Sequence, residues 1–207
     1  MNKKPLFLIV MLLIILCISC PAFQVQKVEA SGTIYIRGDG SVEGTDKIIS
    51  SDNVTYTFTD NIYDEIVVER SNIIIEGNGC RLQGAGNGNG FYLSGINNVA
   101  IQNTSIRDFD CGINLNSTSH SVLSRNNITN NAEGIELDES SNNTMVGNNV
   151  TNNADTGIWL TGSSNTTIVG NNITANKWEG IGLDGSSKNN VVGNNIANNE
   201  DAVHLQR

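Results

Sequence analysis

The chain has 207 residues, a formal net charge of −9 at pH 7 and only 16% charged residues, fewer than ordinary globular domains. An acidic protein lacks the basic surface that nucleic acid or an anionic membrane requires, so we expect neither as a partner. With 21 glycines, many asparagines and only two prolines, the composition is typical of an ordered fold with many corners and excludes a disordered tract.

Residues 1–30 have the pattern of a secretory signal peptide. Lys3 and Lys4 precede an apolar run from Leu6 to Ile18, and a polar stretch follows that ends at Ala30, where we predict cleavage. An uncleaved membrane anchor is the alternative, but this apolar run is short for a span of about 20 residues. We therefore expect a secreted or extracytoplasmic protein, at a cell surface or in a periplasm-like space, with no membrane span after cleavage.

Residues 31–64 lack the repeat that marks the later chain. Val54, Tyr56 and Phe58 alternate with threonines, which predicts one β-strand. An atypical segment before a repetitive array is expected to cover the first unpaired edge, so we assign 31–64 to an N-terminal cap and first strand.

An irregular coil is predicted next, over 65–89. It places Ile66 and Val68 inward and carries its extra residues in the glycine-rich stretch GNGCRLQGAGNGN, which we interpret as a protruding loop. A phosphate-binding role is disfavoured because neither a helix nor a Lys-Ser/Thr pair follows.

The stretch from Gly112 to Ala202 repeats one pattern four times with a period of 22 or 23 residues. Each repeat opens with glycine and an apolar-x-apolar pair, and two further apolar positions follow between Gly/Asn corners. The opening pairs are Ile113/Leu115, Ile135/Leu137, Ile158/Leu160 and Ile181/Leu183. A short fixed period marks a solenoid, in which each unit buries its apolar face against the next.

Three short strands and three corners per repeat predict an all-β, single-stranded right-handed parallel β-helix over 65–207, with coils about 4.8 Å apart. A leucine-rich repeat of similar period is the alternative, but its L-x-x-L-x-L-x-x-N pattern is missing. Because Arg207 falls in mid-coil, we expect either a sequence truncated at its C-terminus or a final edge that pairs end-to-end with another chain.

The phrase SSNNTMVGNNVT, from Ser140 to Thr151 and loosely again from Ser163 to Thr174, resembles the β-helix repeats of periplasmic copper-binding proteins of the NosD type and of the wider pectin-lyase-like group. The resemblance covers roughly residues 60–207 and implies the fold; the group includes copper-site accessory proteins, polysaccharide enzymes and surface proteins.

Copper is implied by the family name alone. A copper site needs converging soft donors, and the chain after residue 30 offers only five, which we expect to lie apart: His120, His204, Cys80, Cys111 and Met145. We therefore expect no metal site and no cofactor. Cys80 and Cys111 are expected at different corners, too far apart for a disulfide.

Two columns of asparagine recur in the repeats. Asn126, Asn148, Asn171 and Asn194 are predicted to lie inward or at a corner and to form a ladder of side-chain hydrogen bonds between coils. The next residues, Asn127, Asn149, Asn172 and Asn195, are expected to face outward. The first three belong to Asn-x-Thr sequons, and five further sequons lie elsewhere in the chain; all are glycan acceptors in a secreted protein unless the repeat alone dictates them. The eight sequon asparagines are Asn53, Asn103, Asn116, Asn127, Asn142, Asn149, Asn165 and Asn172.

The outer face of the first strand in each coil is the best candidate site. In β-helix polysaccharide enzymes this sheet forms the floor of the substrate groove, so the resemblance implies the same place here. Trp159 and, three coils away, Tyr92 would stack on sugar rings. The candidate sugar-binding residues on this face are Tyr92, Asn114, Glu136, Asp138, Trp159 and Asp184.

Glu136 and Asp138 are the alternative catalytic pair. Two residues apart on a strand, their Cα atoms would be about 6.6 Å apart, close to the roughly 6.5 to 9.5 Å that separates the carboxyl groups of an inverting glycosidase. Any two acids on one strand face show this spacing, and the complete signatures of polygalacturonases and pectate lyases are missing.

The sequence thus predicts a secreted, non-catalytic β-helix that acts as a scaffold or carbohydrate-binding surface, with a polysaccharide or cell-surface glycan as partner. One alternative is a polysaccharide hydrolase or lyase acting on the same face. The other is a structural cell-surface protein with glycans on its sequons.

Overall fold

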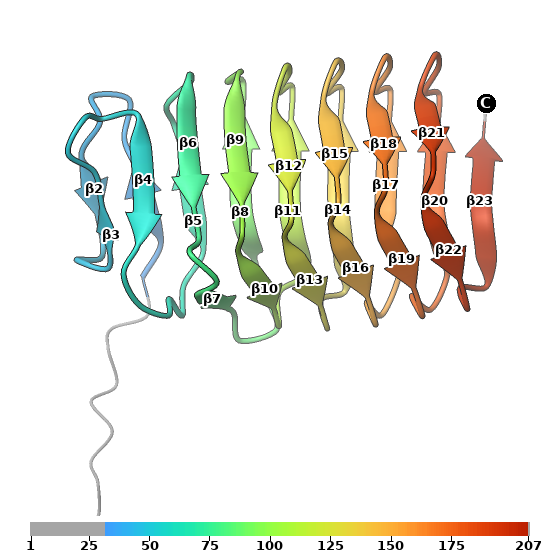
Figure 1. The fold of residues 1–207 in the computed structure, drawn as a ribbon, viewed down its shortest axis with the longest axis horizontal. Coiled ribbons are helices and arrows are strands. Elements are labelled where there is room, and N and C mark those ends of the chain that lie inside the picture. Colours follow the sequence, from blue (N-terminus) through green and yellow to red (C-terminus); the bar gives the residue numbers. More distant parts are fainter. Residues whose placement is uncertain (1–31, 207) are drawn as a thin grey trace, which may run out of the picture. The chain divides into compact units, whose positions relative to one another are not determined.

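The computed structural model describes residues 32–206, and the predicted signal peptide and Arg207 lie outside this range. Within it the chain forms strands and no helix. Successive coils stack in a row in chain order (Figure 1). Equivalent residues of neighbouring coils pair in register 22 or 23 positions apart. The predicted all-β, right-handed parallel β-helix and its coil length are confirmed.

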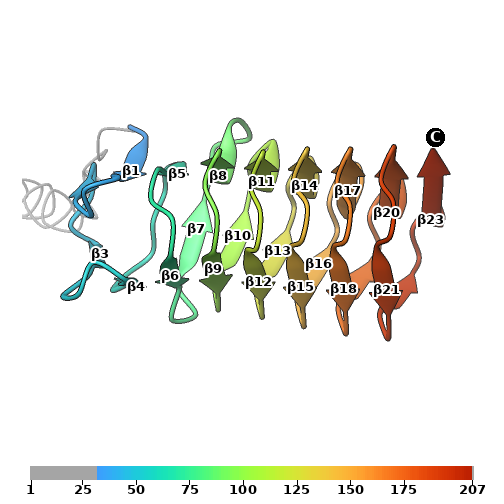
Figure 2. The same cartoon turned by 90° about the horizontal axis from the view of Figure 1, so that it is seen from above.

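Three sheets run along the solenoid. Sheet A has nine strands, in spatial order β2 (Val42–Glu43), β1 (Ile34–Ile36), β5 (Ile66–Val68), β8 (Asn89–Ser94), β11 (Cys111–Asn116), β14 (Glu133–Asp138), β17 (Ile158–Thr161), β20 (Glu179–Asp184) and β23 (Asp201–Gln206). It lies along one side of the coils, and sheet B lies along the other (Figure 2).

Sheet B has eight strands, β3 (Ile48–Ile49), β4 (Thr55–Phe58), β6 (Ile73–Glu76), β9 (Val99–Gln102), β12 (Val122–Ser124), β15 (Thr144–Val146), β18 (Thr167–Val169) and β21 (Asn190–Val192). Sheet C has six, β7 (Arg81–Gln83), β10 (Ser105–Arg107), β13 (Asn127–Thr129), β16 (Asn149–Thr151), β19 (Asn172–Thr174) and β22 (Asn195–Ala197).

The N-terminal segment enters the solenoid through two parallel pairings. Strand β1 pairs with β5 and β4 with β6, whereas the short β2 and β3 attach to them in antiparallel fashion. Tyr56 and Phe58 of β4 are fully buried, and the Tyr56 hydroxyl donates to the carbonyl of Gly40 at 2.9 Å. Val54 was predicted to belong to this strand, but it precedes β4 and is 44% exposed.

The core is a stack of aliphatic columns. Ile113, Ile135, Ile158 and Ile181 are register partners on sheet A and are all fully buried. Met145 is a fully buried member of the sheet B column, as predicted. Since each coil buries its apolar positions only against neighbouring coils, stability comes from stacking rather than from a closed globular core.

The corners explain the asparagine and glycine content. Backbone φ is positive at a series of stacked corner residues, for example Asn142 (61°) and Asn165 (55°). Asparagine and glycine tolerate this left-handed conformation best. Polar residues beside the corners point inward: Asn126 donates its Nδ2 proton to the Oδ1 atom of Asn148 at 3.2 Å, and Asn148 donates to Asn171 at 3.0 Å. The predicted ladder is confirmed.

The glycine-rich stretch was interpreted as a protruding loop, and that interpretation is wrong at its centre. Residues Arg81–Gln83 form β7, the first strand of sheet C, and Leu82 is fully buried. Leu82 fills the position that Ile106 occupies one coil later, so the inward apolar residue determines the backbone although glycines surround it.

Candidate functional site

The glycine that opens each coil determines which side chains share the outer face of sheet A. A Cβ atom on Gly134 would point inward, 2.6 Å from Cγ1 of Val150 and 2.3 Å from the carbonyl oxygen of Gly157. Gly134 and Ile135 therefore face the interior in succession, which breaks the strict alternation of a strand. As a result Glu133 and Glu136, on either side of this pair, both face outward.

The predicted site residues share this face. Register pairing aligns Tyr92, Asn114, Glu136 and Trp159 in one column. Asp138 and Asp184 belong to the neighbouring column, which also contains Asn116 and Thr161. The six predicted side chains are all half-buried: Tyr92, Asn114, Glu136, Asp138, Trp159 and Asp184.

The indole of Trp159 is held in one position by a hydrogen bond and by packing on the next coil. Its Nε1 atom donates to Oγ1 of Thr161 at 2.9 Å. Its six-membered ring covers Gly182, the register partner of Trp159, so closely that a Cβ atom there would lie 2.0 Å from Cε3. Only glycine leaves room for the indole, which is thus fixed on the outer face.

Carboxylates dominate the same face. Asn114 donates from Nδ2 to Oε2 of Glu136 at 2.5 Å. Burial raises the pKa of Glu136, and the negative charge of Asp138 adds to the shift. Burial also raises the pKa of Glu133, to about 7, with further contributions from Glu136 and Asp155.

These shifts predict a pH-dependent stability. Folded Glu133 keeps its proton between its ordinary pKa of 4.5 and about 7, whereas the unfolded chain loses it, so the free energy of unfolding falls as pH rises through this window. We expect Glu133→Gln to be more stable than the wild type at pH 8 and similar to it at pH 4. Urea unfolding at both pH values, with a chelator present to remove cations, measures the difference.

The exposed Glu139 provides the control for that measurement. Glu139→Gln removes the same net charge without relieving a half-buried carboxylate. An equal gain at pH 8 in both variants would show that net charge alone, and not the surroundings of Glu133, is responsible.

Sequence reasoning missed two features of this face. Cys111, Glu133 and Glu136 offer ligand atoms that all lie within 4.8 Å of one another. Trp178 is 52% exposed and, with Glu179, Glu200 and Asp201, lines a small hollow of about 220 Å³ near the end of sheet A. The repeat signalled the first feature, because Cys111 and Glu133 occupy equivalent positions in successive coils.

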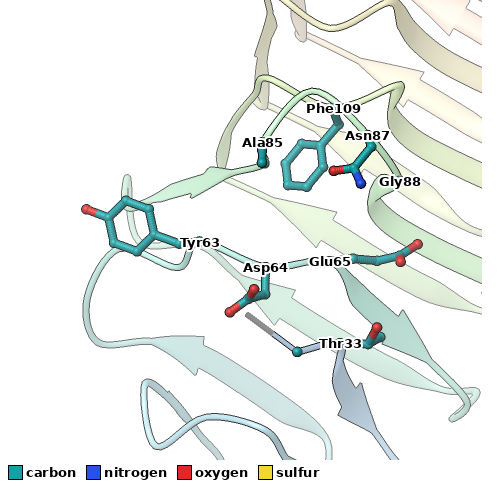
Figure 3. Close-up of a pocket in the computed structure, with 10 residues that line it drawn as sticks. Thr33, Tyr63, Asp64, Glu65, Ala85, Asn87, Gly88 and Phe109 are labelled. Atoms are coloured by element: carbon teal, nitrogen blue, oxygen red, sulfur yellow. The ribbon is translucent and has the colours of Figure 1, made fainter. Parts of the chain in front are cut away.

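A second pocket of about 220 Å³ lies where the glycine-rich stretch meets the first coils. Figure 3 shows Phe109 and Asn87 on one side of it and Asp64 and Thr33 on the other. Glu65 at its rim accepts a hydrogen bond from Nδ2 of Asn89 at 3.0 Å. No residue predicted from sequence as a binding residue lines this pocket.

The eight sequon asparagines differ in how their side-chain amides are engaged. Four donate Nδ2 hydrogens to other side chains: Asn103, Asn116, Asn149 and Asn172. The other four are exposed at corners or on sheet C: Asn53, Asn127, Asn142 and Asn165. Glycan attachment would meet less obstruction at the second group, because its amides need not give up those bonds.

The sequence matches the family described as "Periplasmic copper-binding protein (NosD)" over residues 25–207. The chain belongs to this NosD family. No relative was found among curated protein sequences. Within residues 32–206 of the NosD-family chain, no helix is long and apolar enough to cross a membrane.

Solved structures similar to the NosD-family chain share its fold. A double mutant of the periplasmic alginate epimerase AlgG is 22% identical with a TM-score of 0.64, and the match covers 70% of this chain and 36% of the epimerase. The unmutated AlgG is 21% identical with a TM-score of 0.56, over 73% and 43% of the two chains. An alginate lyase from Paenibacillus sp. is 16% identical with a TM-score of 0.50, over 63% and 68%. The chain therefore spans less than half of the epimerase.

The residues present do not fit the copper of the family description. Copper favours converging thiolate, thioether and imidazole ligands. Met145 is fully buried in the core, and His120 is exposed at a corner. Within residues 32–206, the one group of three His, Cys, Asp or Glu residues close enough to hold a metal is Cys111, Glu133 and Glu136, which offers a single soft donor. Cys80 and Cys111 are both free thiols.

Proposed function

We propose that this NosD-family chain is a non-catalytic, extracytoplasmic β-helix that binds a polysaccharide or cell-surface glycan along the outer face of sheet A. The observation that carries the proposal is the fixed position of the Trp159 indole on the outer face. An indole held by Thr161 and packed on Gly182 loses little conformational freedom when a sugar ring stacks on it, so binding has a low entropic cost.

The length of the face suits a chain of sugars rather than a single one. Tyr92 lies three coils from Trp159 in the same column, which is about 14 Å at the usual spacing of strands. Asn114 and Glu136 lie between the two aromatic residues and offer an amide and a carboxylate to sugar hydroxyl groups. The fold shared with polysaccharide-acting enzymes supports a ligand of the same general kind.

The charge of the face favours a neutral or amino-bearing glycan over an acidic one. From β8 to β23 the outward register positions hold no lysine or arginine, but they hold Glu136, Asp138 and Asp184. Repulsion between these carboxylates and a polyanion would oppose binding at low ionic strength.

Affinity electrophoresis in gels that contain neutral, acidic or amino-bearing polysaccharides tests this proposal. We expect retardation in the neutral or amino-bearing gels, and we expect Trp159→Ala to weaken it about tenfold, since an aromatic contact contributes about 1 to 1.5 kcal/mol. Trp178→Ala is the matched control, because it removes the second tryptophan of the chain, which lies at a corner and not in the column of Trp159. If Trp159→Ala is retarded as strongly as the wild type, the ligand binds elsewhere on the protein. If no gel retards the wild type, the protein is a scaffold without glycan binding.

A second variant tests whether binding needs the indole in its observed position or only its presence. Gly182→Ala places a methyl group where the ring of Trp159 lies and should displace the ring, shifting tryptophan fluorescence and weakening retardation while the indole is retained. Weaker retardation in this variant would show that the effect of Trp159→Ala does not come from removing the side chain and thereby destabilising the fold.

A polysaccharide hydrolase or lyase is the second candidate, favoured by one observation. Burial raises the pKa of Glu136, as a general acid requires, while Asp138 lies two residues away on the same face. Release of shortened or unsaturated sugars from the same polysaccharides, abolished by Glu136→Gln, would establish this candidate and overturn the non-catalytic assignment.

A further inference from the structure

Cys111, Glu133 and Glu136 form a compact group between two neighbouring coils. Cys111 on β11 is the register partner of Glu133 on β14, and Glu136 follows Glu133 three residues later on the same strand. Ligand atoms of the three side chains all lie within 4.8 Å of one another. Within residues 32–206 this is the one such group; the positions equivalent to Cys111 hold Asn89 one coil before it and Glu179 further along.

Within residues 32–206 the three groups have no cationic partner nearby. Cys111 is only 5% exposed and its thiol is free. Asn114 donates to one oxygen of Glu136. Within the described residues neither carboxylate forms an ion pair.

Such a convergence is unfavourable without a cation. Two half-buried carboxylates repel each other, and a buried thiol beside them resists ionisation. A divalent cation would reverse each of these effects, because metal binding deprotonates the ligands and attracts both carboxylates. The raised pKa values of all three groups agree with this account.

The ligand atoms, one sulfur and the oxygens of two carboxylates, favour one kind of metal ion. Calcium and magnesium take oxygen ligands and leave a thiolate aside, and copper favours more sulfur or nitrogen than one thiolate provides. Zinc accepts thiolate and carboxylate together, with three protein ligands and an open fourth position. Zn–S and Zn–O bonds of about 2.3 and 2.1 Å in a tetrahedron place ligand atoms about 3.5 Å apart. The ligand atoms now lie within 4.8 Å of one another, so the two glutamate side chains would have to rotate toward the thiol to bind the ion.

We propose that Cys111, Glu133 and Glu136 bind a zinc ion on the outer face of sheet A, with the fourth position open to solvent. This site differs from the copper of the family description in its metal, and it does not depend on glycan binding. Zinc there would place a positive centre, with an exchangeable water, on an otherwise acidic face, one coil from Trp159.

The test is metal binding to the reduced chain, with Cys17 and Cys20 replaced by serine so that only Cys80 and Cys111 remain. Competition with a chromophoric chelator measures zinc affinity, and cobalt substitution reports the ligand through a thiolate-to-metal charge-transfer band. We expect one equivalent of zinc, a cobalt thiolate band, and a loss of affinity of at least about tenfold in Cys111→Ser and in Glu133→Gln. Cys80→Ser and Glu179→Gln, which alter a cysteine and a glutamate outside the group, should bind as the parent does.

Glu133→Gln keeps the conclusion secure if Cys111→Ser folds poorly, because Glu133 is half-exposed. Failure of the parent to bind one equivalent of zinc would overturn the site, as would binding lost in Cys80→Ser instead of Cys111→Ser. Preferential retention of Cu(I) over zinc through Cys111 would overturn the choice of metal. No glycan is present in these measurements, so their outcome is independent of whether the protein binds a glycan.

Discussion

Asn148→Ala is expected to lower the free energy of unfolding by about 3 kcal/mol. The Oδ1 atom of Asn148 accepts from the backbone N–H and the Nδ2 group of Asn126, at 3.0 and 3.2 Å, and its Nδ2 donates to the carbonyl of Leu123 and to Asn171, at 2.8 and 3.0 Å. Alanine removes all four of these hydrogen bonds: the backbone N–H of Asn126 loses its acceptor, whereas Nδ2 of Asn126 keeps its bond to the carbonyl of Ile101, and Oδ1 of Asn171 still accepts from the backbone N–H of residue 148. Each buried unsatisfied polar group costs about 1 to 3 kcal/mol, and water entering the vacated space offsets part of the total.

The neighbouring position provides a matched control. Asn149 also bonds its equivalents in adjacent coils, at 2.6 and 2.7 Å, but its column lies on the outer surface of sheet C, where water replaces the lost bonds. Asn149→Ala should therefore cost less than about 1 kcal/mol. Urea unfolding followed by circular dichroism compares the two variants. Equal losses would show that burial of the ladder contributes nothing beyond its hydrogen bonds.

The ladder also shows how far sequence reasoning extended. The column of Asn126 was predicted because each member lies two residues before an apolar residue of the repeat, Ile128, Val150, Ile173 or Ile196. A second column of the same kind follows five residues later and was overlooked: Asn131, Asn153, Asn176 and Asn199. Its members lie in the corners between a sheet C strand and the next sheet A strand, and no aliphatic residue follows two positions later, so these asparagines were indistinguishable from ordinary corner residues. The period was the available signal, since a buried polar residue must find its partner in the next coil.

Alternation of apolar residues predicted the outer face of sheet A, but it did not predict everything on it. Strict alternation places Cys111 and Ile113 on the same side. The structure places Cys111 outward because Gly112 faces the interior beside Cγ2 of Ile128, leaving no space for a Cβ atom. The grouping of Cys111 with two glutamates therefore depends on close packing between strands, which a hydrophobic pattern does not encode.

The position of Trp159 has a similar origin. Sequence placed the indole outward, which the structure bears out, but its orientation depends on the absence of a side chain one coil away, at Gly182. In a solenoid the environment of a residue is made by residues 22 or 23 positions distant, so each site is specified by the comparison of successive repeats and not by any one of them.

Gly134→Ala is the second change for which we expect a loss of about 3 kcal/mol. Its new Cβ atom would lie 2.3 Å from the carbonyl oxygen of Gly157 and 2.6 Å from Cγ1 of Val150. Overpacking of this kind commonly costs 1 to 3 kcal/mol, and here the obstructing atom is backbone that pairs with the next strand, so β14 and β17 must separate for it to be relieved. Gly38→Ala is the control, since its Cβ atom would lie 3.7 Å from the nearest atom, at ordinary contact distance.

The same substitution connects the packing of the coils to the outer face. Glu133 and Glu136 flank the Gly134–Ile135 pair, so a displaced backbone would move both carboxylates relative to Cys111 and should weaken zinc binding in molecules that still fold. Urea unfolding and cobalt absorption on one preparation of Gly134→Ala measure both effects. A destabilised protein with an unaltered cobalt spectrum would contradict the argument that the inward glycine, rather than the flanking side chains themselves, sets the geometry of the group.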